Sequence, residues 1–282
     1  MLIALVSGKG SPGTSTTALG LALAWPRQVL LADCDPRGGD LVWGYGQGKF
    51  APGTGLLALQ VNSRRCSSIF EALWLATVQL GEDRWALPGL DESRQAGSVE
   101  WPSVARALRA VPPGVDVIAD CGVVPAHRPP TPIWTAADLV VVMNRSSLKS
   151  TRAALNAGGL LRSDLMSSGF GADRLVSVVV GAGMPYSLGE VTEAMAPVAP
   201  VLGEVPWEVQ AASTLSDGAV AKRRHLGGFT SAAGQLAGLL QTRAEEVAGS
   251  DVVASQAVSA PFAASVNGRH HNGSANGGVF GE

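Results

Sequence analysis

The fold is decided by the stretch Gly8-Lys9-Gly10-Ser11-Pro12-Gly13-Thr14-Ser15. Gly8 and Gly13 enclose four residues. This is the spacing of the Walker A phosphate-binding loop, which then requires Lys followed by Ser or Thr. The Lys position holds Thr14 and the next holds Ser15, whereas a lysine stands early in the loop at Lys9. The stretch predicts phosphate binding and leaves open whether a nucleotide is hydrolysed or only bound.

The segments on either side of the loop are those that a phosphate-binding loop needs. Leu2–Ser7 is apolar like a buried strand, and Thr14–Trp25 has apolar residues at helical spacing before Pro26. Glycines let backbone N–H groups converge on phosphate oxygens, and the helix adds the positive end of its dipole. Ser15 is placed to offer its hydroxyl to Mg²⁺. The alternative is a tight strand-to-helix turn that binds nothing.

Composition indicates a soluble globular protein. A chain of 282 residues with 46% hydrophobic residues suits one large α/β domain or two small ones. The net charge of −2 creates no field that favours nucleic acid or membranes. Three cysteines are too few for a disulfide framework, and reduced cytosolic thiols are the simple interpretation. Because we find neither a signal peptide nor a long apolar run, we expect a cytoplasmic protein without a membrane anchor.

Apolar strands alternate with helical segments along residues 1–248. Strands are expected at Leu2–Ser7, Val29–Asp33, Trp85–Leu87, Val115–Asp120, Leu139–Met143, Leu175–Val180 and Val201–Val205. Helices are expected at Thr14–Trp25, Ser68–Gln79, Ser103–Val111, Ser147–Leu161, Leu188–Met195, Val209–Leu215 and Phe229–Ala248. The alternation predicts a three-layer, doubly wound α/β fold with a mostly parallel sheet and helices on both faces. Residues 249–282 are rich in Ala, Ser, Gly and Asn, which predicts a disordered tail after one nucleotide-binding domain.

Carboxylates follow two of the expected strands. Asp33-Cys34-Asp35-Pro36 ends the second strand, and Asp120 ends the strand that starts at Val115. Ligands of open α/β sheets bind at this edge, where carboxylates hold a metal ion or orient an attacking water. The alternative is that these carboxylates only cap turns. Asp116 is expected at the exposed start of its strand.

With these motifs the chain resembles the MinD/ParA family of deviant Walker A ATPases. The family loop K-G-G-x-G-K-T-T corresponds to Lys9-Gly10-Ser11-Pro12-Gly13-Thr14-Ser15-Thr16. Lys9 matches the signature lysine, which in the family reaches the partner subunit's phosphates in a nucleotide sandwich dimer. Asp33 and Asp35 match the family's D-x-D, whose first carboxylate lies near Mg²⁺ and whose second positions the hydrolytic water. Asp120 matches the Walker B carboxylate.

The resemblance extends over residues 1–243. Ala137-Asp138-Leu139 matches the family's A-D-x strand, and Val201–Pro206 matches the segment near the adenine. Pro36–Leu41 is similar to the pilus-associated CpaE/TadZ branch. The resemblance implies a SIMIBI-type P-loop fold that binds ATP or ADP with Mg²⁺ and forms a homodimer on ATP binding. The dimer is expected to engage a protein partner of a pilus, secretion or partition system.

The resemblance also implies the site residues. Lys9 and Asp35 are the expected catalytic residues, and the metal is expected on Ser15, Asp33 and Asp120. The nucleotide is expected on Gly8, Lys9, Gly10, Ser11, Pro12, Gly13, Thr14, Ser15, Thr16, Pro206 and Trp207.

Two departures from the family pattern bear on activity. Thr14 replaces the P-loop lysine, and charge-assisted contacts of that kind contribute about 1.5–3 kcal/mol each. Gly181-Ala182-Gly183 stands where the family has an adenine-reading Asn, and Trp207 either stacks on a base or packs internally. Such losses are common in the CpaE/TadZ branch, so a slow or non-hydrolysing switch that positions a pilus or secretion apparatus is expected. A nucleotide-independent scaffold and a DNA-partitioning ATPase are the alternatives.

Three smaller features are open to more than one interpretation. Cys34 and Cys121 fit small buried residues better than a redox pair. The basic run at residues 222–225 fits a solvated turn better than a site for DNA or acidic headgroups. The helix from Phe229 fits core packing better than membrane binding, because its polar face lacks Lys and Arg.

Overall fold

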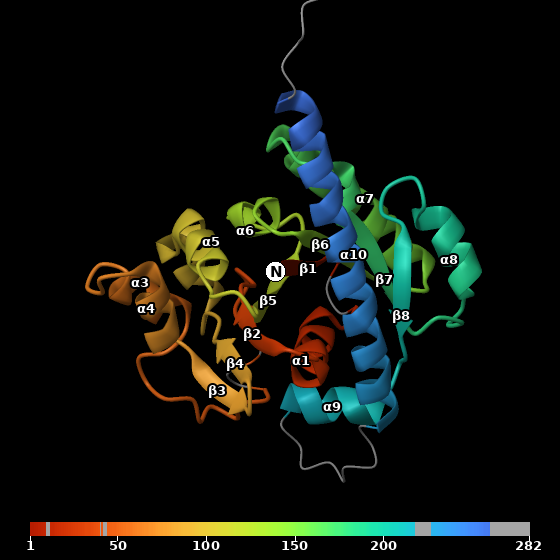
Figure 1. The fold of residues 1–282 in the computed structure, drawn as a ribbon. Coiled ribbons are helices and arrows are strands. Elements are labelled where there is room, and N and C mark those ends of the chain that lie inside the picture. Colours follow the sequence, from red (N-terminus) through yellow and green to blue (C-terminus); the bar gives the residue numbers. More distant parts are fainter. Residues whose placement is uncertain (10–11, 40, 42–43, 218–226, 260–282) are drawn as a thin grey trace, which may run out of the picture.

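The protein is an α/β sandwich built on an eight-stranded sheet (Figure 1). The computed structural model describes residues 1–9, 12–39, 41, 44–217 and 227–259, with the side chains of 251–259 excepted. The strands are β1 (Leu2–Ser7), β2 (Gln28–Asp33), β3 (Val78–Gly81), β4 (Arg84–Leu87), β5 (Val115–Val123), β6 (Leu139–Arg145), β7 (Leu175–Val180) and β8 (Val201–Val205). Their spatial order is β3-β4-β2-β5-β1-β6-β7-β8, and every pair is parallel except the antiparallel β3–β4 hairpin.

Helices cover both faces of this sheet. They are α1 (Thr14–Ala24), α3 (Leu56–Asn62), α4 (Ile69–Leu75), α5 (Trp101–Arg109), α6 (Thr131–Thr135), α7 (Leu148–Ser167), α8 (Leu188–Met195), α9 (Val209–Asp217) and α10 (Gly227–Ser259). One core joins α1, α9 and α10 to one face of the sheet, and a second core joins α3 to α8 to the other. β1 contributes Leu2, Ala4 and Val6 to one core and Ile3 and Leu5 to the other, as the two-residue period of a strand requires. The predicted fold class is confirmed.

The segment after residue 68 corrects one expected element. Ser68 caps α4 by accepting a hydrogen bond from the Glu71 amide, as its sequence predicts, but the helix ends at Leu75 rather than at Gln79. The Thr77 hydroxyl donates to the carbonyl of Trp74, and the chain then enters β3. Because the apolar residues after Ser68 have helical spacing, the sequence did not indicate the short edge strand β3. The short helices α3 and α6, of seven and five residues, were not predicted either.

The last helix is longer than expected. α10 continues past Ala248 to Ser259, so residues 249–259 are helical where the beginning of a disordered tail was expected. A single glycine at 249 costs a helix only about 1 kcal/mol, and the next proline is Pro261. Residues 260–282 lie outside the described part of the chain. Within that part, no helix has the length and hydropathy needed to cross a membrane.

Asp116 is buried, which corrects the expectation that it lies at an exposed strand start. Asp116 is only 4% exposed. Its carboxylate accepts hydrogen bonds from the Trp25 indole at 2.8 Å and from the Arg27 guanidinium at 2.9 Å. Trp25 follows α1 and covers this end of β5. The carboxylate therefore ties α1 to the sheet at the edge opposite the phosphate-binding loop.

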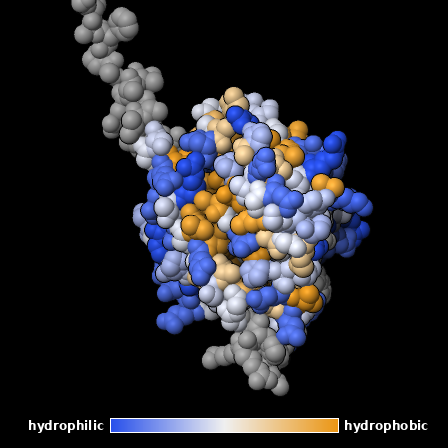
Figure 2. Space-filling view, turned by 90° about the vertical axis from the view of Figure 1, so that its right-hand side faces the viewer, coloured by the Kyte–Doolittle hydropathy of each residue, from blue (hydrophilic) through white to orange (hydrophobic). Residues whose placement is uncertain are grey.

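α8 and β8 lie on the right-hand side of Figure 1, with α10 next to β8. Figure 2 faces this side and shows apolar residues gathered left of its centre, between polar margins. Gly203 of β8 lets α10 pack closely, because a Cβ there would lie 3.3 Å from Leu239 Cδ1 and 3.4 Å from Leu236 Cδ1. Leu239 remains 45% exposed, so part of this apolar surface faces solvent.

Candidate functional site

The phosphate-binding loop is shaped by its two outer glycines. A Cβ on Gly8 would lie 2.0 Å from the carbonyl oxygen of Ala153 in α7, so only glycine fits there. Gly13 caps α1 with a φ of 89°, in the left-handed region that favours glycine. These contacts hold the loop between β1 and the start of α1, as predicted. The predicted ligands Gly10 and Ser11 lie outside the described residues.

A cavity of about 540 Å³ opens beside this loop. Seven of the predicted nucleotide-binding residues line it: Pro12, Gly13, Thr14, Ser15, Thr16, Pro206 and Trp207. The loop and the segment after β8 are about 190 positions apart in the chain and meet here because their strands end at the same edge of the sheet. Gly8 and Lys9 do not line this cavity, and Lys9 is exposed on the loop.

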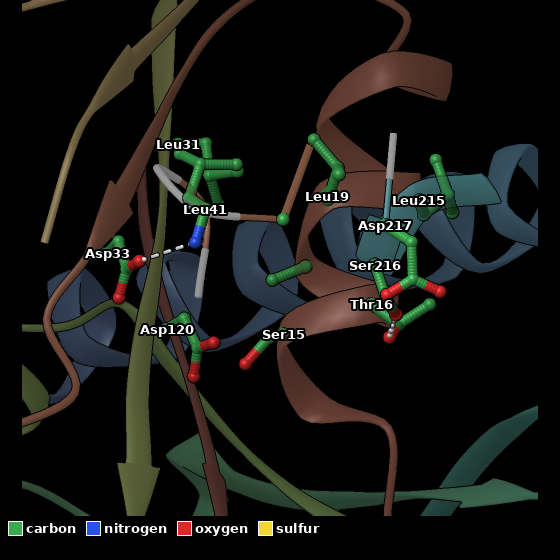
Figure 3. A pocket seen from close by; sticks show the side chains of 12 residues that line it. Ser15, Thr16, Leu19, Leu31, Asp33, Leu41, Asp120, Leu215, Ser216 and Asp217 are labelled. Atoms are coloured by element: carbon green, nitrogen blue, oxygen red, sulfur yellow. Dashed lines mark hydrogen bonds between the residues drawn. The ribbon is translucent and has the colours of Figure 1, made fainter. Parts of the chain in front are cut away.

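The predicted metal ligands meet in a second cavity of about 410 Å³ (Figure 3). Figure 3 shows the Ser15 hydroxyl turned toward Asp120, with Asp33 on the neighbouring strand. Leucines from several elements form the apolar part of its wall: Leu19, Leu31, Leu41 and Leu215. Ser15, Thr16 and Ser216 line both cavities, so the start of α1 separates them.

The pKa of Asp33 is strongly raised in this site. Burial, and to a smaller extent the nearby charge of Asp120, raise the pKa of Asp33 to about 8 from the usual aspartate value of 3.8. The Leu41 amide, which donates to Asp33 at 3.3 Å, opposes this rise only in part. Asp33 and Asp120 are therefore two buried carboxylates at adjacent strand positions.

These residues fit a magnesium ion. Mg²⁺ is usually held by one or two carboxylates together with waters and phosphate oxygens, not by an all-protein cage. In the described residues no group of three or more His, Cys, Asp or Glu is arranged to hold a metal. Asp33, Asp120 and the Ser15 hydroxyl would supply the protein's share of the ligands. A cation between them would offset both the burial and the repulsion from Asp120 that raise the pKa of Asp33.

Asp35 is close enough to Asp33 to act on its pKa, but its carboxylate has other partners. Both of its carboxylate oxygens accept hydrogen bonds from Arg37: the backbone amide donates at 2.8 Å, and Nε lies 3.1 Å from each oxygen. Gly122, with a φ of 68°, leaves room for it, since a Cβ there would lie 2.2 Å from Asp35 Cγ. Asp35 lines the cavity with Trp207 and not the one with Asp33. To orient a water as the resemblance implies, it would have to give up contacts with Arg37.

Thr14 occupies the lysine position of the loop as a buried residue. It is 5% exposed, and its Oγ1 is buried with no hydrogen-bond partner in the part of the chain that the structure describes. A buried hydroxyl without a partner is unusual in folded proteins. Thr14 lines the larger cavity, where a ligand oxygen could satisfy it.

Trp207 is 41% exposed at the mouth of the larger cavity. The Arg145 guanidinium carbon lies 3.9 Å from its ring centroid, a cation–π contact that holds one side of the ring. Gly181 has a φ of 69°, and a Cβ there would lie 3.0 Å from Trp207 Cβ and 3.1 Å from Met184 Cε. The indole thus takes the space beside the position where the family pattern has Asn.

Some residues of the site were not predicted from the sequence. Arg37, Glu208, Ser216 and Phe229 line the larger cavity, and Arg145 packs on Trp207. Only Arg37 had a usable signal, because it directly follows the carboxylates of the second strand. Glu208 lies between β8 and α9, whereas Ser216, Phe229 and Arg145 come from α9, α10 and β6, and no local motif marks these residues.

The cysteines behave as the packing interpretation predicts. Cys34 and Cys121 are both fully buried and free, and burial raises the pKa of each thiol. They directly follow Asp33 and Asp120, which are paired across β2 and β5. The basic run at residues 222–225 lies outside the described residues.

Together, the sheet order and the glycine loop between β1 and α1 define an α/β fold of the P-loop type. No protein-family model and no curated protein matches the chain. Solved structures of MinD and ParA ATPases do match it. The ParA family ATPase from Chlorobium tepidum TLS matches with a TM-score of 0.67 and 16% identity, covering 84% of this chain and 96% of that one.

Two MinD structures give the same result. The cell division ATPase MinD from Pyrococcus furiosus matches with a TM-score of 0.66 and 17% identity over 86% of this chain and 98% of that one. The septum site-determining protein MinD from Pyrococcus horikoshii OT3, solved with Mg-ADP, matches with a TM-score of 0.62 and 16% identity over 87% and 95%. At these identities the likeness shows that the chain has the MinD/ParA ATPase fold.

Proposed function

We propose that the protein is an ATP-dependent switch. The observation that carries this proposal is that the residues Pro12 to Thr16 line one cavity with Pro206 and Trp207, while Ser15 also meets Asp33 and Asp120 in the adjoining cavity. In this proposal the larger cavity binds the phosphates and the base, and the adjoining cavity binds the metal ion. The MinD from Pyrococcus horikoshii, which has this fold, was solved with Mg-ADP.

Each group has a role in this proposal. Backbone N–H groups of the loop and the α1 N-terminus bind the phosphates, and Trp207 lies beside the base. Ser15, Asp33 and Asp120 hold Mg²⁺, which neutralises charge on the phosphate oxygens. The Thr14 hydroxyl donates to a phosphate oxygen in place of the missing lysine.

Hydrolysis is proposed to be slow or absent. Thr14 supplies no charge to the phosphates, and the contacts of Asp35 with Arg37 compete with its binding a water. A nucleotide that remains bound suits a protein that signals by assembly rather than one that turns over rapidly.

Assembly is proposed to depend on Lys9. Its exposed position on the loop allows it to reach the phosphates of a second copy, giving a homodimer on ATP binding. The dimer then positions a partner of a pilus or secretion apparatus, which recruits it from the cytoplasm to a cell pole or membrane. The MinD of Aquifex aeolicus, which has the same fold with a TM-score of 0.63, was solved in a complex with MinC.

Isothermal titration with ATP·Mg²⁺ and with ADP tests the switch against a nucleotide-independent scaffold. We expect saturable binding that Asp120→Asn weakens in a magnesium-dependent way. The exposed carboxylate control Glu193→Gln should bind like the wild type. Absence of binding at millimolar nucleotide would favour the scaffold.

A DNA-partitioning ATPase is the second alternative. It depends on the basic run at residues 222–225. A gel shift of non-specific DNA with ATP, lost in Arg223→Ala/Arg224→Ala, would favour this alternative over positioning of a pilus or secretion apparatus.

A further inference from the structure

A third cavity, of about 400 Å³, lies among α3, α4 and α5, the helices at the left of Figure 1. It shares no residue with the two cavities at the phosphate-binding loop. Its wall is formed by Gln60, Ser63, Arg64, Ile69, Glu100, Ser103 and Arg106. Six of these seven side chains are polar or charged, which is unusual for a space between packed helices.

Two arginines from different elements converge on this cavity. Arg64 follows α3, and Arg106 belongs to α5. Within the described residues, neither guanidinium forms an ion pair or a side-chain hydrogen bond. Glu100 is the single carboxylate of the wall, so the lining carries a net charge of +1 from two arginines and one glutamate. The cavity is therefore electropositive and has unused donors.

Gln60 adds a donor that has no partner. Its Oε1 accepts a hydrogen bond from the Glu100 backbone amide at 3.3 Å, which sets the orientation of the side-chain amide. Nε2 is consequently left buried, with no acceptor in the part of the chain that the structure describes. Buried amide donors are nearly always hydrogen-bonded, so an acceptor in the cavity would complete this group.

The wall also offers hydroxyl groups. The Ser63 hydroxyl donates to the Gln60 carbonyl at 2.9 Å, whereas Ser103 lies in the first turn of α5 and faces the same cavity. Two guanidinium groups, one amide and one hydroxyl together present more donors than a carboxylate has acceptor positions. A tetrahedral oxyanion has enough oxygens to accept from all of them.

We propose that this cavity binds the phosphate group of a small phosphomonoester. Arg64 and Arg106 contact the phosphate oxygens from the rim, and Gln60 Nε2 and Ser103 donate from within. Glu100 accepts a hydroxyl or amine of the rest of the ligand, which distinguishes a phosphomonoester from free phosphate. The site is independent of the nucleotide proposed for the loop.

The test is isothermal titration of the full chain with phosphoserine and with inorganic phosphate. We expect both to bind, phosphoserine more tightly. Arg64→Gln/Arg106→Gln should weaken binding by about tenfold or more for each guanidinium removed. Gln60→Glu, which replaces the buried donor with an acceptor of the same shape, should weaken it as well. The matched control is Arg65→Gln, which removes an exposed neighbouring charge that does not line the cavity.

The phosphate-binding loop requires a separate control. Each titration is repeated with saturating ADP·Mg²⁺, and circular dichroism verifies that every variant is folded. Phosphate binding that persists in ADP·Mg²⁺ and is lost in the arginine variant supports the proposal. Absence of binding, or binding that ADP·Mg²⁺ abolishes and the arginine variant retains, overturns it, and neither result bears on whether the loop binds ATP.

Discussion

Asp33 on β2 and Asp120 on β5 are register partners, so two buried carboxylates stand side by side at the carboxyl edge of the sheet. Because burial and Asp120 together raise the pKa of Asp33 to about 8, the metal-free protein holds a proton on Asp33 at neutral pH. The same two carboxylates that would bind a cation therefore lower the stability of the folded protein when no cation is bound.

Asp33→Asn should stabilise the metal-free protein at alkaline pH. The pKa of Asp33 in the folded protein lies above the usual aspartate value of 3.8, so this group costs no stability below about pH 4, and the cost grows as pH rises toward about 8. The variant removes this cost, which is on the order of several kcal/mol at its upper limit. Urea unfolding without magnesium at pH 5, 6.5 and 8 measures the difference. The exposed control Asp91→Asn should show no such trend. The prediction would be contradicted if the stability gain of Asp33→Asn over the wild type were no larger at pH 8 than at pH 5.

Gly8→Ala should destabilise the fold through its contact with α7. The new Cβ would lie 2.0 Å from the Ala153 carbonyl oxygen, so the loop or the helix must shift, at a cost of about 1–3 kcal/mol. Gly159→Ala in the same helix is the matched control, because a Cβ there meets nothing within 4 Å. It should stabilise the protein by up to about 1 kcal/mol. Equal effects of the two substitutions in thermal unfolding would mean that the loop does not pack as described.

Thr14→Lys should increase the affinity of the loop for the phosphates of ATP. A lysine at this position of the larger cavity adds a charge-assisted contact, and we expect ATP to bind about tenfold more tightly or to turn over faster. Thr14→Val is the matched variant that keeps the shape and removes the hydroxyl. Because that hydroxyl has no partner in the described residues, the valine variant should be as stable as the wild type but bind ATP more weakly. If lysine changed neither affinity nor turnover, the loop geometry would differ from that of an active P-loop.

Trp207→Ala should weaken ATP binding if the indole lies against the base. Stacking of a base on an aromatic ring contributes about 1–3 kcal/mol, which corresponds to roughly fivefold to a hundredfold in affinity. Trp207→Phe keeps an aromatic face and should retain most of the affinity. Titrating both variants with ATP and with triphosphate alone separates the base from the phosphates. Equal losses for both ligands would indicate that Trp207 acts only through packing.

The parts of this fold that follow a local period could be predicted from the sequence, whereas the parts set by distant contacts could not. Strands such as Leu175–Val180 and the loop before Thr14 are marked by their own residues, so their order led directly to the sheet. The edge strand β3, Val78–Gly81, was missed because the helical spacing of the residues before it continued the expected helix to Gln79. Asp116 was assigned to the surface because its partner Trp25 lies 91 positions away.

The same distinction holds within the site. Ser15, Asp33 and Asp120 could be named because each follows or begins a regular element, and the structure brings them to one cavity. The pairing of Asp35 with Arg37 and that of Trp207 with Arg145 depend on side-chain conformations that no sequence pattern records. The first pairing matters for activity, because an Asp35 carboxylate that is bound to Arg37 is not free to orient a water.

Lys9→Ala should abolish ATP-dependent dimerisation while leaving the fold and ATP binding by the monomer largely intact. Lys9 is exposed on the loop and does not line either cavity of its own subunit, so its proposed contact is with the nucleotide of a second copy. Lys149→Ala, on the exposed surface of α7, removes the same charge elsewhere and should dimerise like the wild type. Light scattering with and without ATP·Mg²⁺ measures the dimer, and titration calorimetry on the same samples measures nucleotide binding. If Lys9→Ala dimerised normally, the lysine would have no role between subunits; if it lost ATP binding altogether, Lys9 would act on the phosphates of its own subunit instead.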